Sequence, residues 1–178
     1  MTDLSKYDNS WYNPGGNVLK RFLWYFVNAL VIKNHLNPIS GIRVKALRLF
    51  GAKIGRGVVI KPGANVKYPW LLTVGDYSWI GEDVWIDNLA EVSIGSNCCL
   101  SQGAMLLCGN HNYRLPTFDL MVKPIIVEDG AWVGAKSVVC PGVTVGRDSI
   151  LTVGSMATSN LEPGKIYQGI PAVVKSVR

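Results

Sequence analysis

The pattern that decides the fold begins with Ile54-Gly55-Arg56-Gly57-Val58-Val59-Ile60, where an aliphatic residue returns at the sixth position. The spacing continues to Ala157, with two shifts of two residues and one interruption after Leu106. An α-helix repeats about every 3.6 residues and a half-buried strand about every 2, so neither produces it. The aliphatic positions in register are Ile54, Ile60, Val66, Leu72, Val74, Ile80, Ile86, Val92, Ile94, Leu100, Leu106, Val127, Val133, Val139, Val145, Leu151 and Ala157.

A six-residue repeat corresponds to one short strand and one corner, so three repeats complete a triangular coil. The aliphatic residue points inward and stacks on its counterparts above and below, while glycine suits corners where φ is positive. We interpret the two-residue shifts as bulges at the corners. The pattern therefore predicts an all-β fold, a parallel β-helix of hexapeptide repeats over residues 54–160. A β-sandwich is disfavoured, because alternation in segments of about eight to twelve residues is missing.

Residues 1–53 are expected to form an arm followed by two helices that pack on the coils or cover their open end, where edge strands would otherwise be unpaired. The first predicted helix spans 17–34, and its apolar face is expected to pack on the coils. An interfacial contact with a membrane through residues 20–33 is the alternative, because Lys20 and Arg21 precede the apolar run. The face in question contains Phe22, Leu23, Phe26, Leu30 and Val31.

The second predicted helix spans 41–50, with Ser40 as its cap. Its apolar positions are Ile42, Leu47, Leu49 and Phe50, and the side chains expected in solvent are those of Arg43, Lys45 and Arg48.

The composition fits one domain of 178 residues with 48% hydrophobic residues. No apolar run is long enough to cross a bilayer, and the polar N-terminus does not resemble a signal peptide. The four cysteines lack metal-ligand spacing, so we expect reduced, structural thiols in a cytoplasmic protein, with the inner face of the membrane as an alternative location. The net charge of +6 suits a phosphorylated cofactor or an anionic membrane. Nucleic acid is disfavoured, because no basic run is interleaved with aromatic residues.

The interruption of the repeat at residues 108–125 is the strongest functional signal, because a long loop that leaves a repeat is usually functional or disordered. It contains His111, one of two histidines in the chain. Imidazole titrates near neutral pH, so it can take a proton from an attacking hydroxyl and pass it to a leaving group. His111 is our candidate general base, with an ordinary exposed histidine as the alternative. We expect His35 to be structural.

Several motifs resemble those of the WcaF-like colanic acid biosynthesis acetyltransferases, and the resemblance spans nearly the whole chain. The block from Gly130 to Gly146 is typical of the wider family of hexapeptide-repeat sugar O-acetyltransferases. The resemblance implies a left-handed β-helix, a homotrimer without a metal, and transfer of acetyl from acetyl-CoA to a hydroxyl of a sugar or exopolysaccharide precursor. It also implies that His111 is the general base. The motifs include Ser101-Gln102-Gly103-Ala104, Gly109-Asn110-His111-Asn112-Tyr113, Lys67-Tyr68-Pro69-Trp70 and Trp85-Ile86-Asp87-Asn88.

The resemblance also assigns binding residues. Ser159 and Val173 stand where the family often has Lys and Arg, so two charges that could bind the CoA phosphates are missing. Lys175 is a candidate to replace them on proximity alone. In relatives the coil before the loop histidine binds the acceptor, although they carry Asn at the position of Asp83. The alternative to sugar binding by Asp87 and Asn88 is that their side chains only close a turn. The alternative for Trp85 is that it packs on outer neighbours or at a subunit interface. The acetyl-CoA positions are Gly134, Ala135, Val153, Gly154, Thr158, Ser159 and Lys175, and the acceptor positions are Asp83, Trp85, Asp87 and Asn88.

Three other functions are compatible with a β-helix and compete with acetyl transfer. A γ-type carbonic anhydrase holds zinc with three histidines, and this chain has two. A sugar nucleotidyltransferase needs a larger N-terminal domain than residues 1–53 supply. A non-catalytic β-helix that binds or scaffolds other molecules stays open, but it does not explain why the repeat breaks at His111.

Overall fold

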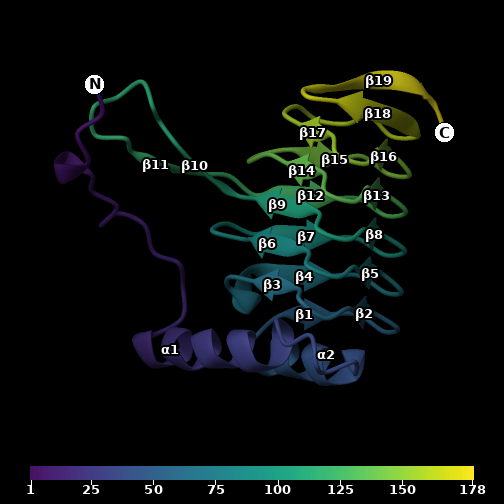
Figure 1. Ribbon diagram of the computed structural model, residues 1–178, viewed down its shortest axis with the longest axis horizontal. Helices are drawn as coiled ribbons and strands as arrows, with labels where there is room; N and C mark the ends of the chain where they lie inside the picture. The colour runs from purple at the N-terminus through teal and green to yellow at the C-terminus, as the bar shows by residue number, and fades with distance from the viewer.

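The computed structural model describes all 178 residues, and its body is a stack of triangular coils with parallel strands on three faces (Figure 1). The first face contains β1 (Lys53–Ile54), β4 (Leu72–Val74), β7 (Val92–Ile94), β12 (Ile125–Val127) and β15 (Thr144–Val145). The second contains β2 (Val59–Ile60), β5 (Trp79–Ile80), β8 (Cys99–Leu100), β13 (Trp132–Val133), β16 (Ile150–Leu151) and β18 (Lys165–Gly169). The third contains β3 (Asn65–Val66), β6 (Trp85–Asp87), β9 (Met105–Leu107), β14 (Val138–Val139) and β17 (Met156–Ala157).

The register of the coils follows the aliphatic repeat. Ile60 lies beside Ile80, and Ile80 beside Leu100, so each inward side chain has an equivalent neighbour in the next coil. All seventeen predicted inward residues are at most 8% exposed. The predicted parallel β-helix is confirmed.

The two-residue shifts have a different cause from the one predicted. Leu72 and Val74 are both buried within the three-residue strand β4, and Val92 and Ile94 are both buried within β7. Alternate residues of a strand share a face, so these strands each supply two inward side chains. The interpretation as corner bulges is therefore wrong.

Two helices form a layer across the start of the stack (Figure 1). α1 (Val18–Val27) is capped by the side chain of Asn17 and continues into the π-helical turn η2 (Asn28–Ile32), and α2 (Ser40–Leu49) follows. Trp24 is the buried residue of α1, and its indole N–H donates to the carbonyl of Val66 at 2.9 Å.

The predicted packing face of the first helix is largely wrong. Its four positions Phe22, Leu23, Phe26 and Leu30 are exposed, and Val31 is half-buried. The opposite face packs on the coils, because it carries Trp24, whose N–H needs a buried acceptor. Because the helix is apolar on both sides, its sequence alone does not determine which side packs on the coils.

The second helix also differs from the prediction. Arg43 is buried rather than exposed, and it donates to the carbonyls of Ile32, Asn34, Asn37 and Ile60. These acceptors lie in the turn between the helices and in the first coil, so one guanidinium joins three segments. The apolar positions Ile42 and Leu49 are exposed instead. Ser40 is the first helical residue, not the cap, and its hydroxyl accepts a hydrogen bond from the Ile60 amide.

Three further segments complete the chain. The predicted loop is an antiparallel hairpin of β10 (Gly109–His111) and β11 (Leu120–Val122) that leaves the stack sideways. The N-terminal arm, with the short 3-10 helix η1 (Leu4–Lys6), lies beside it, and the amide of Asp3 donates to the Pro116 carbonyl. Another 3-10 helix, η3 (Pro69–Leu71), precedes β4. At the far end, β18 pairs with β19 (Ala172–Val177) as a second hairpin.

Candidate functional site

His111 lies at the end of β10, where it faces the N-terminal arm. Its Nδ1 is 2.9 Å from the carbonyl oxygen of Phe118. A carbonyl can only accept, so Nδ1 carries a proton, and in the neutral form of the ring the lone pair is on Nε2. The Phe118 ring stacks on the imidazole with centroids 4.4 Å apart and nearly parallel planes, and Tyr7 contacts it from the arm at 5.6 Å. The hairpin and the arm thus fix both the tautomer and the orientation of the ring.

A cleft runs between the arm, α1 and the third face of the coils, and we name it the arm cleft. It consists of two adjoining pockets of about 420 and about 330 Å³ that share Arg21, Lys67 and Tyr68. The first contains His111 and the second contains Trp85 and Asp87. The structure therefore brings three of the predicted site residues to one cleft. The other lining residues are Tyr7, Asn9, Tyr12, Pro14, Trp24, Tyr25, Asn28, Asn65, Leu89 and Leu120.

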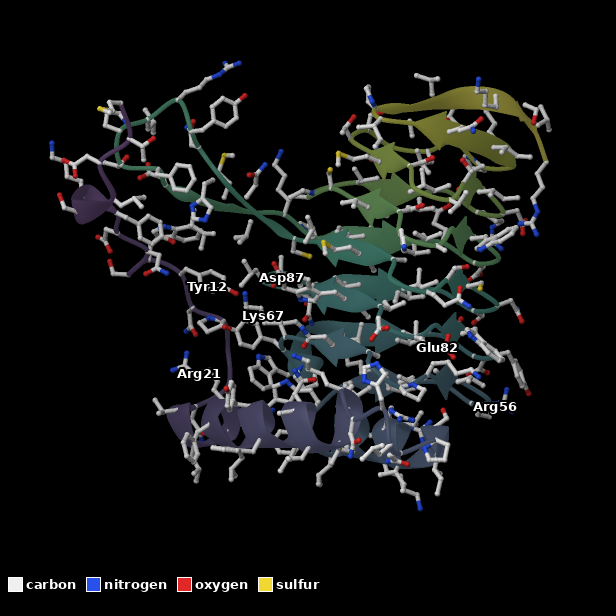
Figure 2. The ribbon with its side chains drawn as sticks, viewed as in Figure 1. Tyr12, Arg21, Arg56, Lys67, Glu82 and Asp87 are labelled. Carbon is white, nitrogen blue, oxygen red and sulfur yellow. The ribbon has the colours of Figure 1, made fainter.

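Charged and aromatic groups meet in the middle of the arm cleft. Lys67 Nζ lies 3.0 Å from Asp87 Oδ1, and Tyr12 reaches from the arm toward the same strand (Figure 2). The Tyr12 hydroxyl donates to the carbonyl of Leu89 at 2.6 Å. Burial raises the pKa of Tyr12, helped by the nearby Tyr68 and Asp87, so this hydroxyl stays a donor. Arg21 on α1 has no carboxylate partner and borders both pockets.

The two other predicted acceptor residues lie elsewhere. Asn88 is fully buried, and its side-chain amide makes both hydrogen bonds with the backbone of Tyr68. Asp83 lies at an exposed corner, where its Oδ1 is 2.8 Å from His35 Nε2. Gly63 sits beneath this pair with φ +78°, and a Cβ there would lie 2.0 Å from the Asp83 carboxylate. Asn88 thus positions Tyr68 in the cleft, and the Asp83–His35 pair joins the helical layer to the coils.

The predicted acetyl-CoA positions border a second region. Gly134, Ala135 and Val153 line a pocket of about 370 Å³ with Trp132 and Gln102. A Cβ on Gly134 would lie 2.6 Å from the Val153 nitrogen, so glycine is required for the two coils to approach there. This pocket shares no residue with the arm cleft.

The remaining predicted cofactor residues are exposed. Gly154 follows Val153 at a corner with open space around it. Thr158 lines a separate pocket with Asn110 and Lys123 at the base of the hairpin, and Ser159 is its neighbour. Lys175 projects from β19 at the far end of the stack. The pocket at Thr158 shares no residue with the pocket at Gly134.

The cysteines form no disulfide, and one of them lies beside the hairpin. All four cysteines are free. Burial raises the pKa of Cys108 to about 11, so the thiol beside the hairpin stays protonated at neutral pH. No group of three or more His, Cys, Asp or Glu side chains is placed to hold a metal ion.

Comparison with known proteins identifies the family, although no family model matches the chain. The sequence is 37% identical over 174 residues to WcaF of Escherichia coli K12, covering 98% of this chain and 96% of WcaF, whose name assigns it to colanic acid biosynthesis as an acetyltransferase. This chain belongs to the WcaF family. It is also 25% identical to the galactoside O-acetyltransferase of Escherichia coli K12, over 79% of this chain and 71% of that protein.

Solved structures share the fold of this WcaF-family protein. The hexapeptide-repeat acetyltransferase VCA0836 from Vibrio cholerae matches with a TM-score of 0.81 at 20% identity, over 90% of this chain and 92% of that one. VCA0836 has also been solved with acetyl-CoA. A galactoside acetyltransferase in complex with coenzyme A matches with a TM-score of 0.79 at 22% identity, over 89% of this chain and 80% of that one.

The arm cleft of this WcaF-family protein contains residues that sequence reasoning missed. Tyr7, Tyr12 and Arg21 come from the arm and α1, which carry no repeat and no recognised binding motif. Lys67 and Tyr68 belong to a stretch that resembles the family, but the stretch gave no hint that they face the arm. Contacts between segments this far apart leave no local pattern in a sequence.

Proposed function

We propose that this protein transfers the acetyl group of acetyl-CoA to a hydroxyl of a sugar or exopolysaccharide precursor, with His111 as general base. The observation that carries the proposal is the fixed tautomer of His111, whose Nδ1 proton is held by the Phe118 carbonyl. A base must present its lone pair to the hydroxyl it deprotonates. Nε2 is the nitrogen left free to do so.

The reaction is a direct transfer within a ternary complex. The acceptor oxygen attacks the thioester carbonyl carbon while its proton passes to Nε2 of His111. The carbon–sulfur bond then breaks, and Nε2 returns the proton to the departing thiolate, which gives an acetyl ester and free CoA. Stacking on the Phe118 ring and the tilted contact with Tyr7 keep the imidazole in place during both proton transfers. The protonated thiol of Cys108 is not required as a nucleophile.

The arm cleft is the proposed acceptor site, because its lining suits a sugar. Trp85 offers a flat ring of the kind that covers the apolar face of a pyranose. Asp87 and Lys67 offer an acceptor and a donor for hydroxyl groups. Tyr12 and Tyr68 enclose the same space from the arm and the coil. Asp83 and Asn88 are not proposed to contact the acceptor: Asn88 holds the backbone of Tyr68 in place, and Asp83 joins the helical layer to the coils through His35.

Acetyl-CoA is proposed to lie along the groove that starts at Gly134, Ala135 and Val153, with Gly154, Thr158, Ser159 and Lys175 farther along it. This groove and the arm cleft share no residue on one chain. A homotrimer would resolve the separation, because the groove of one subunit can face the His111 hairpin of its neighbour. A mass in solution three times the 19.4 kDa of the chain is therefore part of the proposal.

The test follows thiol release from acetyl-CoA with a panel of mono- and oligosaccharides. We expect acceptor-dependent release, reduced by about two to four orders of magnitude in His111→Ala, the usual range for a general base. His35→Ala is the matched control, because it removes the other histidine, which does not line the arm cleft. Thermal melting checks that each variant is folded.

The same experiment separates the alternatives. Near-full activity of His111→Ala would overturn the assignment of the base. If no acceptor gives release, calorimetric titration with CoA decides between an enzyme given the wrong sugar and a non-catalytic β-helix. Binding would support the former, and its absence the latter.

A further inference from the structure

The helical layer exposes an apolar surface on the side that faces away from the coils, and we name it the outer face. On α1 and η2 its side chains are between 45% and 68% exposed. Phe22 contacts Phe26, and Phe26 contacts Tyr25, so the surface is continuous along the helix. These side chains are Leu19, Phe22, Leu23, Phe26 and Leu30.

The outer face continues onto the segment that holds α2. Ile39, Ile42 and Leu49 are 56%, 44% and 82% exposed. Figure 2 shows side chains projecting from both helices away from the stack, and both helices lie across the same end of it. A flat surface could therefore touch both helices at once.

The charge around the outer face has one sign. Residues 9–75 contain ten Lys and Arg residues and no Asp or Glu, in a chain whose net charge is +6. Seven of these cations lie in or beside the helical layer and form no ion pair within the chain. Four of them contact the coil side of the layer: Lys20 lies over the Trp70 ring, Arg21 lines the arm cleft, Arg43 is buried, and Arg48 donates to the carbonyls of Ile54 and Gly55. The three exposed cations without such a contact are Lys33, Lys45 and Lys53.

We propose that the outer face docks onto an anionic lipid bilayer, with α1 lying in the interface. An exposed apolar helix face flanked by Lys and Arg binds at the boundary between headgroups and acyl chains, more strongly when the lipids are anionic. No helix here is long and apolar enough to span the bilayer, so the contact is interfacial. A second copy fits the outer face less well, because two surfaces that carry lysines and no carboxylates repel each other.

The test is co-sedimentation of the full chain with vesicles of phosphatidylcholine, with or without about a third phosphatidylglycerol. We expect the protein to pellet with the anionic vesicles, and less so when salt shortens the Debye length from about 10 Å at 0.1 M. Phe22→Ser combined with Phe26→Ser should weaken partitioning at least about tenfold, because two aromatic side chains no longer enter the interface. Lys33→Glu combined with Lys45→Glu should reduce the binding to anionic vesicles only.

Val174→Ser combined with Val177→Ser is the matched control. These side chains are also exposed, but they lie on β19 at the opposite end of the stack, so partitioning should not change. Thermal melting confirms the fold of each variant. Wild-type protein that stays in the supernatant with anionic vesicles would overturn the proposal, as would equal pelleting of the Phe22/Phe26 variant. So would a loss of oligomer mass in that variant without vesicle binding by the wild type, since the outer face would then belong to a second copy.

Discussion

In the coil stack a buried side chain packs between the side chains at the equivalent positions of the coils above and below. In the helical layer each buried side chain packs against a different type of residue. Leu100 pairs in register with Ile80 on one side and Val133 on the other. Trp24 instead contacts the Phe50 ring at 5.1 Å and donates to the Val66 carbonyl. Stability in the stack is therefore shared among repeats, while the layer depends on a few single contacts.

The same contrast divides structure from chemistry. The coils supply a rigid support, and the residues proposed for the reaction lie where the chain departs from the repeat or where a departure meets a coil. His111 is on the hairpin and Tyr12 on the arm, while Lys67 and Asp87 lie on the coil face opposite them. A regular stack has few concave surfaces of its own, so inserted segments create them.

The largest expected effect is in the core of the stack. Leu100→Ala removes a side chain with no exposed surface, and we expect it to lower the free energy of unfolding by about 2–5 kcal/mol. Leu30→Ala makes the same change at a position that is 68% exposed in the helical layer, and should stay within about 0.5 kcal/mol. Urea denaturation at one protein concentration measures both. Equal losses would contradict the burial of Leu100 and the exposure of Leu30 on which this prediction rests.

This contrast also governs what can be predicted from the sequence. The inward positions were predictable because seventeen residues share one environment, so an error at one position would not change the assignment of the others. In the helical layer each buried position has an environment that occurs only once, so no repeat supports its assignment. Ile42 and Leu49 are as apolar as Val44 and Leu47, yet only the latter pair is buried. His111 could be singled out because it lies in the segment that interrupts the pattern, and Tyr12 was missed because nothing marks its contact 77 residues away.

A smaller loss is expected when Arg43 is removed. Arg43→Ala leaves the carbonyls of Ile32, Asn34, Asn37 and Ile60 without their donor. We expect a loss of about 1.5–3 kcal/mol, typical of hydrogen bonds to a charged group. Lys45→Ala removes an exposed cation two residues away and should change stability by at most about 0.5 kcal/mol.

Arg43→Lys sharpens the same comparison. Lysine keeps the charge but lacks the planar fork of donors that reaches several carbonyls together. It should recover little of the stability lost in Arg43→Ala. Full recovery would mean that the charge alone joins the helical layer to the first coil, and that the single contacts of the layer are less specific than the geometry implies.

The smallest expected effect is at the edge of the arm cleft, where the Tyr12 hydroxyl makes one of two side-chain hydrogen bonds between the arm and the coils; the other runs from the Trp70 indole N–H to the Pro14 carbonyl. Tyr12→Phe removes the 2.6 Å hydrogen bond to the Leu89 carbonyl, which is worth about 0.5–1.5 kcal/mol. Because the arm has few other bonds to the body, this loss should appear as local opening, with cleavage of the arm by a protease about two- to tenfold faster and global stability nearly unchanged. Tyr25→Phe, at an exposed position on α1 without a hydrogen bond from its hydroxyl, is the control. If both variants are cleaved like the wild type, the arm is held by its ring contacts, its backbone bond to Pro116 and the bond from Trp70 to the Pro14 carbonyl, and the Tyr12 hydroxyl is free to serve the acceptor instead.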